Sequence, residues 1–371
     1  DQIKEILFNK QDRPALIVGK KDETGETLFP STYQLTSEGI ALALAKRIGE
    51  LGDKEKLTSQ AQLLRNRTTP SSDGAEILRT PYFCSGCPHN TSTRVPEGSR
   101  GLSGIGCHFM VQKMNRNTET YTHMGAEGVT WVGQAPFNGN QHVFVNIGDG
   151  TYYHSGFLAV RAAVASGANM TYKVLFNDAV AMTGGQPVDG QISVADMTFQ
   201  FYGEGIRRIA VVSDEPEKYS IGTSFAPGTT VHHRDELDLV QKELREWVGV
   251  STLIYDQTCA SEKRRRRKRG TMIDPAKRSF INDAVCEGCG DCSTASNCVS
   301  VEPLETEFGR KRMINQSTCN KDMSCVNGFC PSFVTINGGD LRRPTAEASA
   351  SSSDPLVSNL PDPELPLLNR P

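Results

Sequence analysis

The sequence predicts an α/β protein with a doubly wound, mostly parallel sheet, followed by a small cysteine-rich module. Two apolar runs, Val143–Ile147 and Tyr172–Phe176, are separated by a segment of helix length, which is the pattern of a βαβ unit in a buried parallel sheet. Strand-like and helix-like patterns continue to alternate to about residue 260. Seven of the eleven cysteines then fall within residues 286–330, which indicates a separate metal-binding module.

The other elements of the α/β domain follow from local patterns. Apolar runs predict strands at Ile206–Ser213 and Val250–Tyr255. Between them, Asp235–Trp247 predicts an amphipathic helix, because its leucines and Val240 recur near helical spacing and its acidic start favours a helix N-terminus. We therefore expect one doubly wound domain over residues 81–270.

The two ends of the chain differ from this domain. Residues 1–52 contain one strand candidate, Ala15–Val18, and one helix, Ser37–Ile48, which cannot close a core by themselves. We interpret them as the tail of an upstream α/β domain. Residues 53–80 are polar and predict a linker, and residues 338–371, rich in Pro, Ser and Ala, predict a disordered linker. The chain therefore reads as a piece of a longer polypeptide with domains on both sides.

Composition excludes several classes of protein. The net charge of −3 gives no bulk attraction to nucleic acid. No window approaches the roughly 18 consecutive apolar residues of a membrane span, and no secretory leader opens the chain. Eleven cysteines, clustered at two-residue spacings, are typical of metal or cluster ligands in a reducing cytoplasm rather than of disulfides. We therefore expect a cytoplasmic protein that binds metal.

Polar residues follow both strands of the βαβ unit. Gly148, Asp149 and Gly150 end the first strand, and Asn177 ends the second, with 26 residues between Gly150 and Asn177. In a parallel sheet these ends meet at one edge, where ligands bind. A carboxylate and an amide oxygen suit Mg²⁺ that also binds phosphate, and the glycines allow close approach of a ligand. A Gly-Asp-Gly sequence alone is more typical of a turn.

Together with Ala181–Gln186 (Ala-Met-Thr-Gly-Gly-Gln), this stretch resembles the thiamine-diphosphate motif of the 2-oxoacid:ferredoxin oxidoreductases, and most closely that of the fused indolepyruvate type. The resemblance implies that Asp149, Asn177 and the backbone carbonyl of Ala179 hold magnesium. It also implies that further residues contact the cofactor, namely Met124, Gly125, Gly148, Gly150, Thr183, Gly184, Gly185 and Gln186.

A first group of cysteines precedes the cofactor motif. Cys84 and Cys87 form a Cys-x-x-Cys pair, which fits a redox dithiol, a zinc knuckle or an iron–sulfur site, and Cys107 adds a third thiol. The remaining cysteine outside the module is Cys259. The resemblance implies that these four residues bind a proximal [4Fe–4S] cluster.

The second group lies in the expected module, residues 271–337, and is similar to a bacterial two-cluster ferredoxin. In such proteins the last cysteine of each half binds the cluster of the other half. One cluster would then use the first three cysteines and the last one, and the other cluster would use an aspartate where a cysteine is usual. The two ligand sets are Cys286, Cys289, Cys292 and Cys330, and Cys298, Cys319, Asp322 and Cys325.

A basic run, Lys263–Arg269, follows Cys259 directly. Seven successive cations are typical of a solvated loop, a nucleic-acid patch or a nuclear address. Because the run resembles a segment of the fused indolepyruvate enzymes, we favour the phosphates of coenzyme A or an acidic electron carrier over nucleic acid.

The resemblance implies thiamine-dependent oxidative decarboxylation of a 2-oxoacid, an aryl pyruvate such as indolepyruvate, to acyl-CoA. Electrons would pass through three [4Fe–4S] clusters to ferredoxin, in a homodimer. Two alternatives are a non-oxidative thiamine-dependent decarboxylase with structural clusters, and a non-enzymatic iron–sulfur electron-transfer module. No catalytic base is identified, because the acid that activates the cofactor is expected in another domain. Four histidines near the site loops are candidates for substrate contact: His89, His108, His123 and His154.

Overall fold

The computed structural model of the chain describes residues 2–12, 16–31, 35–49, 54–68, 81–139, 141–188, 190, 192–220, 222–328 and 330–338. The chain divides into two compact units, residues 1–79 and 80–371. The expected disordered segment 338–371 lies outside the described residues, apart from Gly338.

The N-terminal unit is helical where it is described. Its helices are α1 (Gln2–Phe8), α2 (Ser37–Gly49) and α3 (Lys54–Thr68). The predicted helix at Ser37 is therefore confirmed, whereas Leu16–Val18 form no strand. Helix α3 lies inside the segment expected to be a linker. Its Lys, Glu, Leu, Gln and Arg residues are good helix formers. Because most of its residues are polar, the segment resembled a linker in the sequence.

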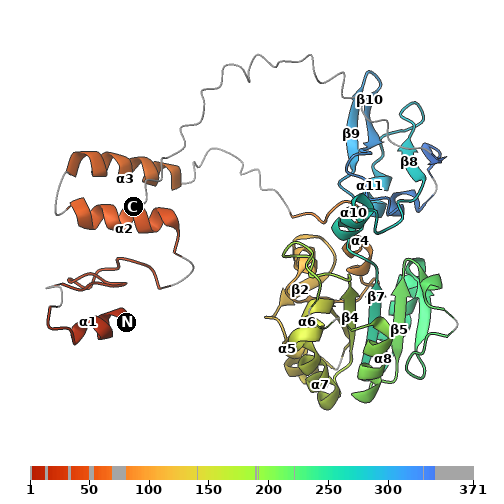
Figure 1. The fold of residues 1–371 in the computed structure, drawn as a ribbon, viewed down its shortest axis with the longest axis horizontal. Helices are drawn as coiled ribbons and strands as arrows, with labels where there is room; N and C mark the ends of the chain where they lie inside the picture. The colour runs from red at the N-terminus through yellow and green to blue at the C-terminus, as the bar shows by residue number, and fades with distance from the viewer. Residues whose placement is uncertain are drawn as a thin grey trace. The chain divides into compact units, whose positions relative to one another are not determined.

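The second unit contains a seven-stranded sheet in the order β2-β1-β3-β4-β7-β5-β6, and all of its neighbours pair in parallel (Figure 1). The predicted α/β class with a mostly parallel sheet is confirmed. Its strands are β1 (Gly101–Ser103), β2 (Thr118–Tyr121), β3 (Val143–Gly148), β4 (Met170–Phe176), β5 (Ile209–Ser213), β6 (Thr230–His233) and β7 (Val250–Asp256).

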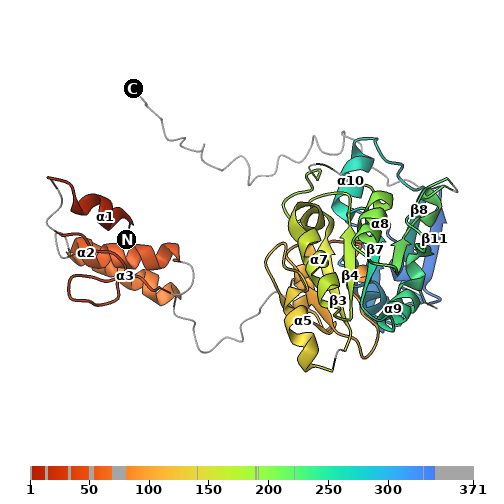
Figure 2. The same cartoon turned by 90° about the horizontal axis from the view of Figure 1, so that it is seen from below.

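Helices pack on both faces of the sheet, as Figure 2 shows. Along β7, Ile254 joins the core that includes α7 (Phe157–Ser166) and α8 (Val194–Gly203), while its neighbours face the core under α9 (Leu237–Arg245). The alternation of side chains along a strand therefore divides one sheet between two apolar cores. This is the doubly wound arrangement that the sequence predicts.

Further helices connect these elements. They are α4 (His89–Ser92), η1 (Cys107–Lys113), α5 (Val129–Gln134), η2 (Ala135–Phe137), α6 (Asp149–Thr151), η3 (Tyr152–Gly156), η4 (Pro216–Lys218), η5 (Arg234–Glu236) and α10 (Ala260–Lys268). Within the described residues, no helix is both long and apolar enough to cross a membrane.

The cysteine-rich module follows α10 and contains two antiparallel strand pairs (Figure 1). Its core contains Ile281, Cys286, Val301 and Ile314, and four further cysteines pack against it. The first and last strands of the module, β8 and β11, pair with each other. Its elements are β8 (Lys277–Ile281), α11 (Asp291–Ser296), β9 (Val301–Thr306), β10 (Gly309–Ile314), η6 (Ser324–Val326) and β11 (Phe333–Asn337).

Candidate functional site

A cavity of about 730 Å³ lies at the carboxyl ends of β3 and β4. Most of the predicted cofactor residues line it: Met124, Gly148, Asp149, Gly150, Asn177, Ala179, Thr183 and Gln186. The other three, Gly125, Gly184 and Gly185, are chain neighbours of lining residues. The topology thus brings together the loops that the sequence singled out.

The carboxylate of Asp149 is held by backbone amides. Its Oδ1 accepts a hydrogen bond from the N–H of Gly150, and its Oδ2 accepts one from the N–H of Asn177, both at 2.8 Å. Burial raises the pKa of Asp149 to about 6, and these amides oppose the shift. A buried carboxylate whose partners are neutral amides retains the capacity to bind a cation. Asp149 therefore fits the role of a magnesium ligand.

The loop after β4 supplies the other two proposed magnesium ligands. Asn177 and Ala179 are 7% and 2% exposed, so their oxygens lie in a largely dehydrated wall of the cavity. The carbonyl of Asn177 accepts a hydrogen bond of 3.0 Å from the N–H of Cys259, because β7 lies next to β4 in the sheet. The proposed magnesium loop and the last proximal cysteine are thus joined by a backbone contact.

The Thr-Gly-Gly-Gln sequence forms a closed turn beside the cavity. Val180 donates to the carbonyl of Gln186 at 2.8 Å, and the hydroxyl of Thr183 donates to the side chain of Gln186 at 2.8 Å. Gly184 and Gly185 have φ angles of +115° and +80°, which favour glycine. A Cβ at Gly185 would lie 2.8 Å from the guanidinium of Arg265. Both glycines are therefore required by this turn.

The Met-Gly turn contacts a buried acid that the sequence reading missed. The N–H of Gly125 donates to Glu127 Oε2 at 2.8 Å, and a Cβ at Gly125 would lie 2.8 Å from the hydroxyl oxygen of Ser155. Glu127 is fully buried, which raises the pKa of its carboxyl group. The sequence could have indicated Glu127, because it is an acidic residue only two positions after Gly125 in the same loop.

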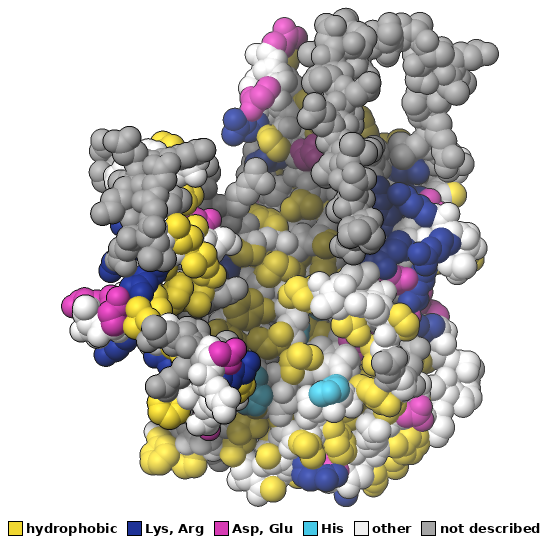
Figure 3. Space-filling model, turned by 60° about the vertical axis from the view of Figure 1, so that its left-hand side comes forward, with side chains coloured by type: hydrophobic (Ala, Val, Ile, Leu, Met, Phe, Trp, Pro, Cys, Tyr) yellow, Lys and Arg dark blue, Asp and Glu magenta, His cyan; other side chains and the backbone are white. Residues whose placement is uncertain are grey.

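Three of the four candidate histidines, His89, His108 and His154, line the cavity, and His123 does not. Burial lowers the pKa of His89 to about 3 and that of His108 to about 4, so both rings are neutral at pH 7. The cavity wall also has exposed apolar side chains, since Met124 and Met182 are 48% and 52% exposed. Figure 3 shows hydrophobic side chains (yellow) and histidines (cyan) at the molecular surface. The cavity thus offers an apolar wall with neutral imidazoles.

The fold brings Cys84, Cys87, Cys107 and Cys259 together. Burial raises the pKa of Cys87 well above its ordinary value, and the other three thiolates raise it further. Burial also raises the pKa of Cys107, and the thiolates of Cys259 and Cys84 raise it further, to about 11. Four clustered sulfurs near a cavity form a donor set that fits an iron–sulfur cluster. Cys107 itself lines the cofactor cavity.

The module also groups its cysteines. Burial raises the pKa of Cys292, and Cys286 and Cys289 add to the shift. Cys330 lies beside Ser332, with Sγ and Oγ 3.0 Å apart, and its place with the first three remains a prediction. No group of three His, Cys, Asp or Glu side chains that could hold a single metal ion occurs in the described part of the chain.

The second set of the module differs in one member. Burial raises the pKa of Cys325 to about 12, and Cys298, Cys319 and Asp322 raise it further. The three cysteines pack against the same small core. However, Asp322 Oδ1 already pairs with Arg234 and accepts a hydrogen bond of 2.8 Å from Gln257 Nε2. The proposed iron ligand therefore has partners in the α/β domain.

The module packs directly against the Cys84–Cys87 loop. The hydroxyl oxygen of Ser85 lies 3.3 Å from Cys298 Sγ, and Asn320 Nδ2 donates to the carbonyl of Ser85 at 2.8 Å. The Cys298, Cys319 and Cys325 site is thus adjacent to the proximal cysteine site.

The basic run is a helix, α10, and not a solvated loop. Lys263 pairs with Asp214 at 2.7 Å, and Arg266 pairs with Asp178 at 2.6 Å. Arg264 and Arg267 donate to backbone carbonyls of the module, those of Ser317 and Asn320, at 2.7 and 2.9 Å. Within the run only Lys268 and Arg269 are exposed. Lys263 and Arg266 therefore hold α10 against the α/β domain, and Arg264 and Arg267 hold it against the module, which leaves few of these cations for phosphates or an acidic partner.

Residues 104–244 match the family model of the thiamine pyrophosphate enzyme C-terminal TPP-binding domain. This range contains β3 and β4 and the loops that line the cavity. The family match and the parallel sheet confirm the predicted thiamine-diphosphate-binding fold.

Curated relatives match a larger part of the chain. The indolepyruvate oxidoreductase subunit IorA of Thermococcus kodakarensis is 27% identical over 304 residues, which cover 75% of this chain and 43% of that protein. The subunits IorA of Archaeoglobus fulgidus and Methanothermobacter marburgensis are 28% and 30% identical, over 82% and 68% of this chain and 46% and 39% of their own lengths. The chain spans less than half the length of these relatives.

Among solved structures, a similar chain belongs to a 2-oxoglutarate:ferredoxin oxidoreductase from Magnetococcus marinus with 2-oxoglutarate, coenzyme A and succinyl-CoA bound. The match has a TM-score of 0.38 at 16% identity and covers 50% of this chain and 66% of that chain.

Proposed function

Since this chain is a homologue of the indolepyruvate oxidoreductase subunits IorA and contains a thiamine pyrophosphate-binding domain, we propose that it belongs to a 2-oxoacid:ferredoxin oxidoreductase. In this proposal it binds thiamine diphosphate and transfers the electrons of the reaction. The substrate would be an aryl 2-oxoacid such as indolepyruvate, the acyl acceptor coenzyme A, and the electron acceptor ferredoxin.

One observation carries the proposal: the proximal cysteine site and the cofactor cavity share a wall. Cys107 lines the same cavity as Asp149 and Asn177. The N–H of Cys259 donates to the carbonyl of Asn177. A redox centre at this place can take electrons from the cofactor, which a non-oxidative decarboxylase does not require. The arrangement therefore favours oxidative chemistry.

The residues of the cavity would hold and orient the cofactor. Asp149, Asn177 and the carbonyl of Ala179 would bind Mg²⁺ and, through it, the diphosphate. When bound, thiamine diphosphate supplies the carbanion stabilisation that decarboxylation of a 2-oxoacid needs. The neutral rings of His89 and His108 can each donate one hydrogen bond and accept another without placing a charge in the apolar wall.

The cysteine sites would form the path of the electrons. Cys84, Cys87, Cys107 and Cys259 would bind the proximal cluster. Because Ser85 contacts Cys298, electrons would next reach the site of Cys298, Cys319 and Cys325. The site of Cys286, Cys289, Cys292 and Cys330 would come last, before ferredoxin.

The test is Asp149→Ala in the complete enzyme, purified without oxygen. Thiamine diphosphate bound after gel filtration should be lost, while iron and sulfide per chain stay unchanged. Wild-type enzyme should reduce ferredoxin when given an aryl 2-oxoacid and coenzyme A, and Asp149→Ala should not. Full cofactor retention in the variant would contradict the magnesium site. Release of aldehyde by wild-type enzyme without ferredoxin reduction would favour the non-oxidative alternative.

A further inference from the structure

We propose that Asp322 anchors the cysteine-rich module to the α/β domain through Arg234 and does not bind iron, so that its cluster site has three protein ligands, Cys298, Cys319 and Cys325. The cluster part of this inference rests on the proposed function, whereas the anchoring part does not.

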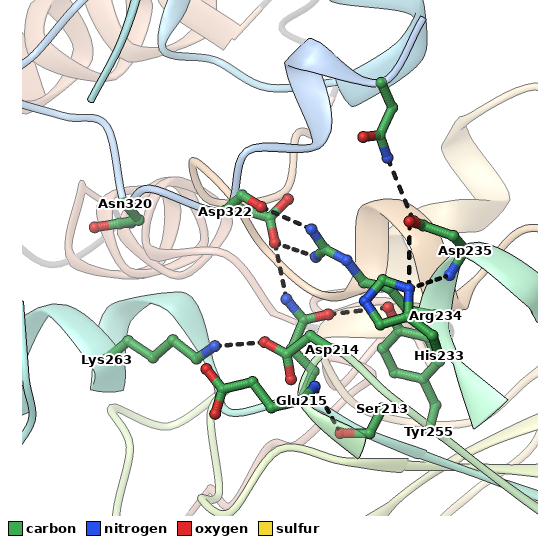
Figure 4. A network of polar contacts seen from close by, with 12 residues as sticks. Ser213, Asp214, Glu215, His233, Arg234, Asp235, Tyr255, Lys263, Asn320 and Asp322 are labelled. Atoms are coloured by element: carbon green, nitrogen blue, oxygen red, sulfur yellow. Dashed lines mark hydrogen bonds and ion pairs between the residues drawn. The ribbon is translucent and has the colours of Figure 1, made fainter. Parts of the chain in front are cut away.

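The contacts of Asp322 are those of a buried ion pair (Figure 4). Its Oδ1 pairs with Nη1 of Arg234, and its backbone carbonyl accepts a hydrogen bond of 2.7 Å from Nη2 of the same guanidinium. Gln257 Nε2 donates to the same Oδ1 at 2.8 Å. The side chains of Arg234 and Asp322 are 12% and 9% exposed. Asp322 is therefore held through both its side chain and its backbone.

The partners of Asp322 are held in place by the sheet. Arg234 begins η5 directly after β6, and the backbone N–H of His233 donates to the Glu236 carboxylate at 3.1 Å across this turn. Gln257 directly follows β7, and its side-chain oxygen accepts a hydrogen bond of 2.9 Å from the hydroxyl of Tyr255. Two segments of the α/β domain, those that follow β6 and β7, thus present donors to one carboxylate oxygen.

Turning this carboxylate toward iron would break the arrangement. Arg234 would be left buried without its counter-charge, which is strongly unfavourable. Asp322 is also confined on its other side, because an added Cβ at Gly86 would lie 2.9 Å from the Cβ of Asp322. Asp322 is close to the three cysteines, but its side chain is committed to the α/β domain. The position of Asp322 between Cys319 and Cys325 in the sequence therefore does not make it an iron ligand.

The anchor fixes the distance between two redox sites. Asp322 lies in the loop between Cys319 and Cys325, and this loop packs against Gly86 of the proximal Cys84–Cys87 loop. The ion pair between Asp322 in this loop and Arg234 in the α/β domain holds the second set of cysteines against the proximal site. Its loss should loosen the module without removing a cluster ligand.

The test compares four variants of the complete protein, purified without oxygen: Asp322→Asn, Asp322→Ala, Arg234→Ala and, as control, Arg310→Ala. Arg310 pairs with Glu305 inside the module, and their side chains are 67% and 69% exposed. The control therefore removes an arginine without removing a contact between the module and the α/β domain. Iron per chain and the electron paramagnetic resonance spectrum report the clusters. Hydrogen exchange of amides in residues 301–325 reports docking of the module.

Asp322→Asn should keep the iron content and the cluster signal of wild type, because Asp322 is not a ligand in this proposal and no ligand is lost. Asp322→Ala and Arg234→Ala should each raise hydrogen exchange by at least about tenfold, since each leaves a buried partner unpaired. A further variant that combines Asp322→Ala with Arg234→Ala should exchange little faster than either single variant, because both substitutions remove the same contact. Arg310→Ala should exchange like wild type.

Loss of iron or of the cluster signal in Asp322→Asn, with both retained in Arg234→Ala, would overturn the inference. So would unchanged exchange in Asp322→Ala and Arg234→Ala. A wild-type protein without cluster iron would instead overturn the proposed electron path, and the exchange measurement would still decide whether Asp322 is the anchor.

Discussion

The two cysteine-bearing regions are assembled in opposite ways. The proposed ligands of the proximal cluster come from three distant parts of the chain: Cys84 and Cys87 before α4, Cys107 at η1, and Cys259 after β7. The seven cysteines of the module lie within one short segment, residues 286–330, around a small core. A local spacing therefore predicts the module, whereas the proximal site exists only when the sheet is formed. Variants that affect one of these two cysteine sites and leave the other unchanged test this difference most directly.

The largest effect is expected for Cys259→Ser. The variant should lose the proximal cluster and block electron exit, because its serine cannot replace a thiolate ligand, while thiamine diphosphate still binds. Cys286→Ser is the matched control, since it should lose a module cluster and leave the proximal one. Iron analysis and spectroscopy of both variants measure the difference. Equal iron in Cys259→Ser and wild type would remove Cys259 from the site.

The next effect concerns the charge of Asp149 in metal-free protein. Because burial raises its pKa from 3.8 to about 6, the folded state binds this proton more tightly than the unfolded state does. The free energy of unfolding should therefore fall as the pH rises from about 4 to about 6, by on the order of 2 to 3 kcal/mol. Asp149→Asn should lack this decrease and be the more stable protein at pH 7.

Chemical denaturation of wild type and Asp149→Asn at pH 4.5 and pH 7 measures this difference. Magnesium with thiamine diphosphate should restore the stability of wild type at pH 7 and have no such effect on the variant. A wild type that gains stability between these pH values relative to the variant would contradict the assignment.

A smaller effect is expected along α10. Arg267 donates to the carbonyl of Asn320 in the module and its side chain is 14% exposed, whereas Lys268 is exposed. Arg267→Ala should destabilise the protein by about 1 to 3 kcal/mol, because the half-buried carbonyl of Asn320 loses a charged donor. Lys268→Ala, one residue further, should change stability by less than about 0.5 kcal/mol. Thermal unfolding of the two variants side by side decides between a docking helix and a solvated basic run.

The smallest effect is expected for Glu305→Ala, which breaks the exposed pair with Arg310 on the β9–β10 hairpin. Exposed pairs contribute about 0 to 1 kcal/mol. Its unfolding curve should nearly superimpose on that of wild type. A large destabilisation would contradict the small contribution expected of an exposed pair.

Much of the α/β domain could be read from the sequence because its signals are local. The strands at Val143 and Val250 are apolar runs between turn residues, and both are present in the structure. The Gly-Asp-Gly and Thr-Gly-Gly-Gln turns needed no long-range information either. Helix α3 was missed because a polar helix without an apolar face resembles a linker.

The sequence by itself determined the class of the fold, the thiamine-diphosphate motif and the cysteine-rich module, because strand periodicity, turn glycines and ligand spacing are properties of neighbouring residues. Only the tertiary structure decided the partners of Asp322 and of the cations in α10. These depend on strand order: β7 lies between β4 and β5, which brings Cys259 to Asn177 and Gln257 to Asp322. Charges pair with whatever the sheet places beside them, and the order of a sheet is not the order of the chain.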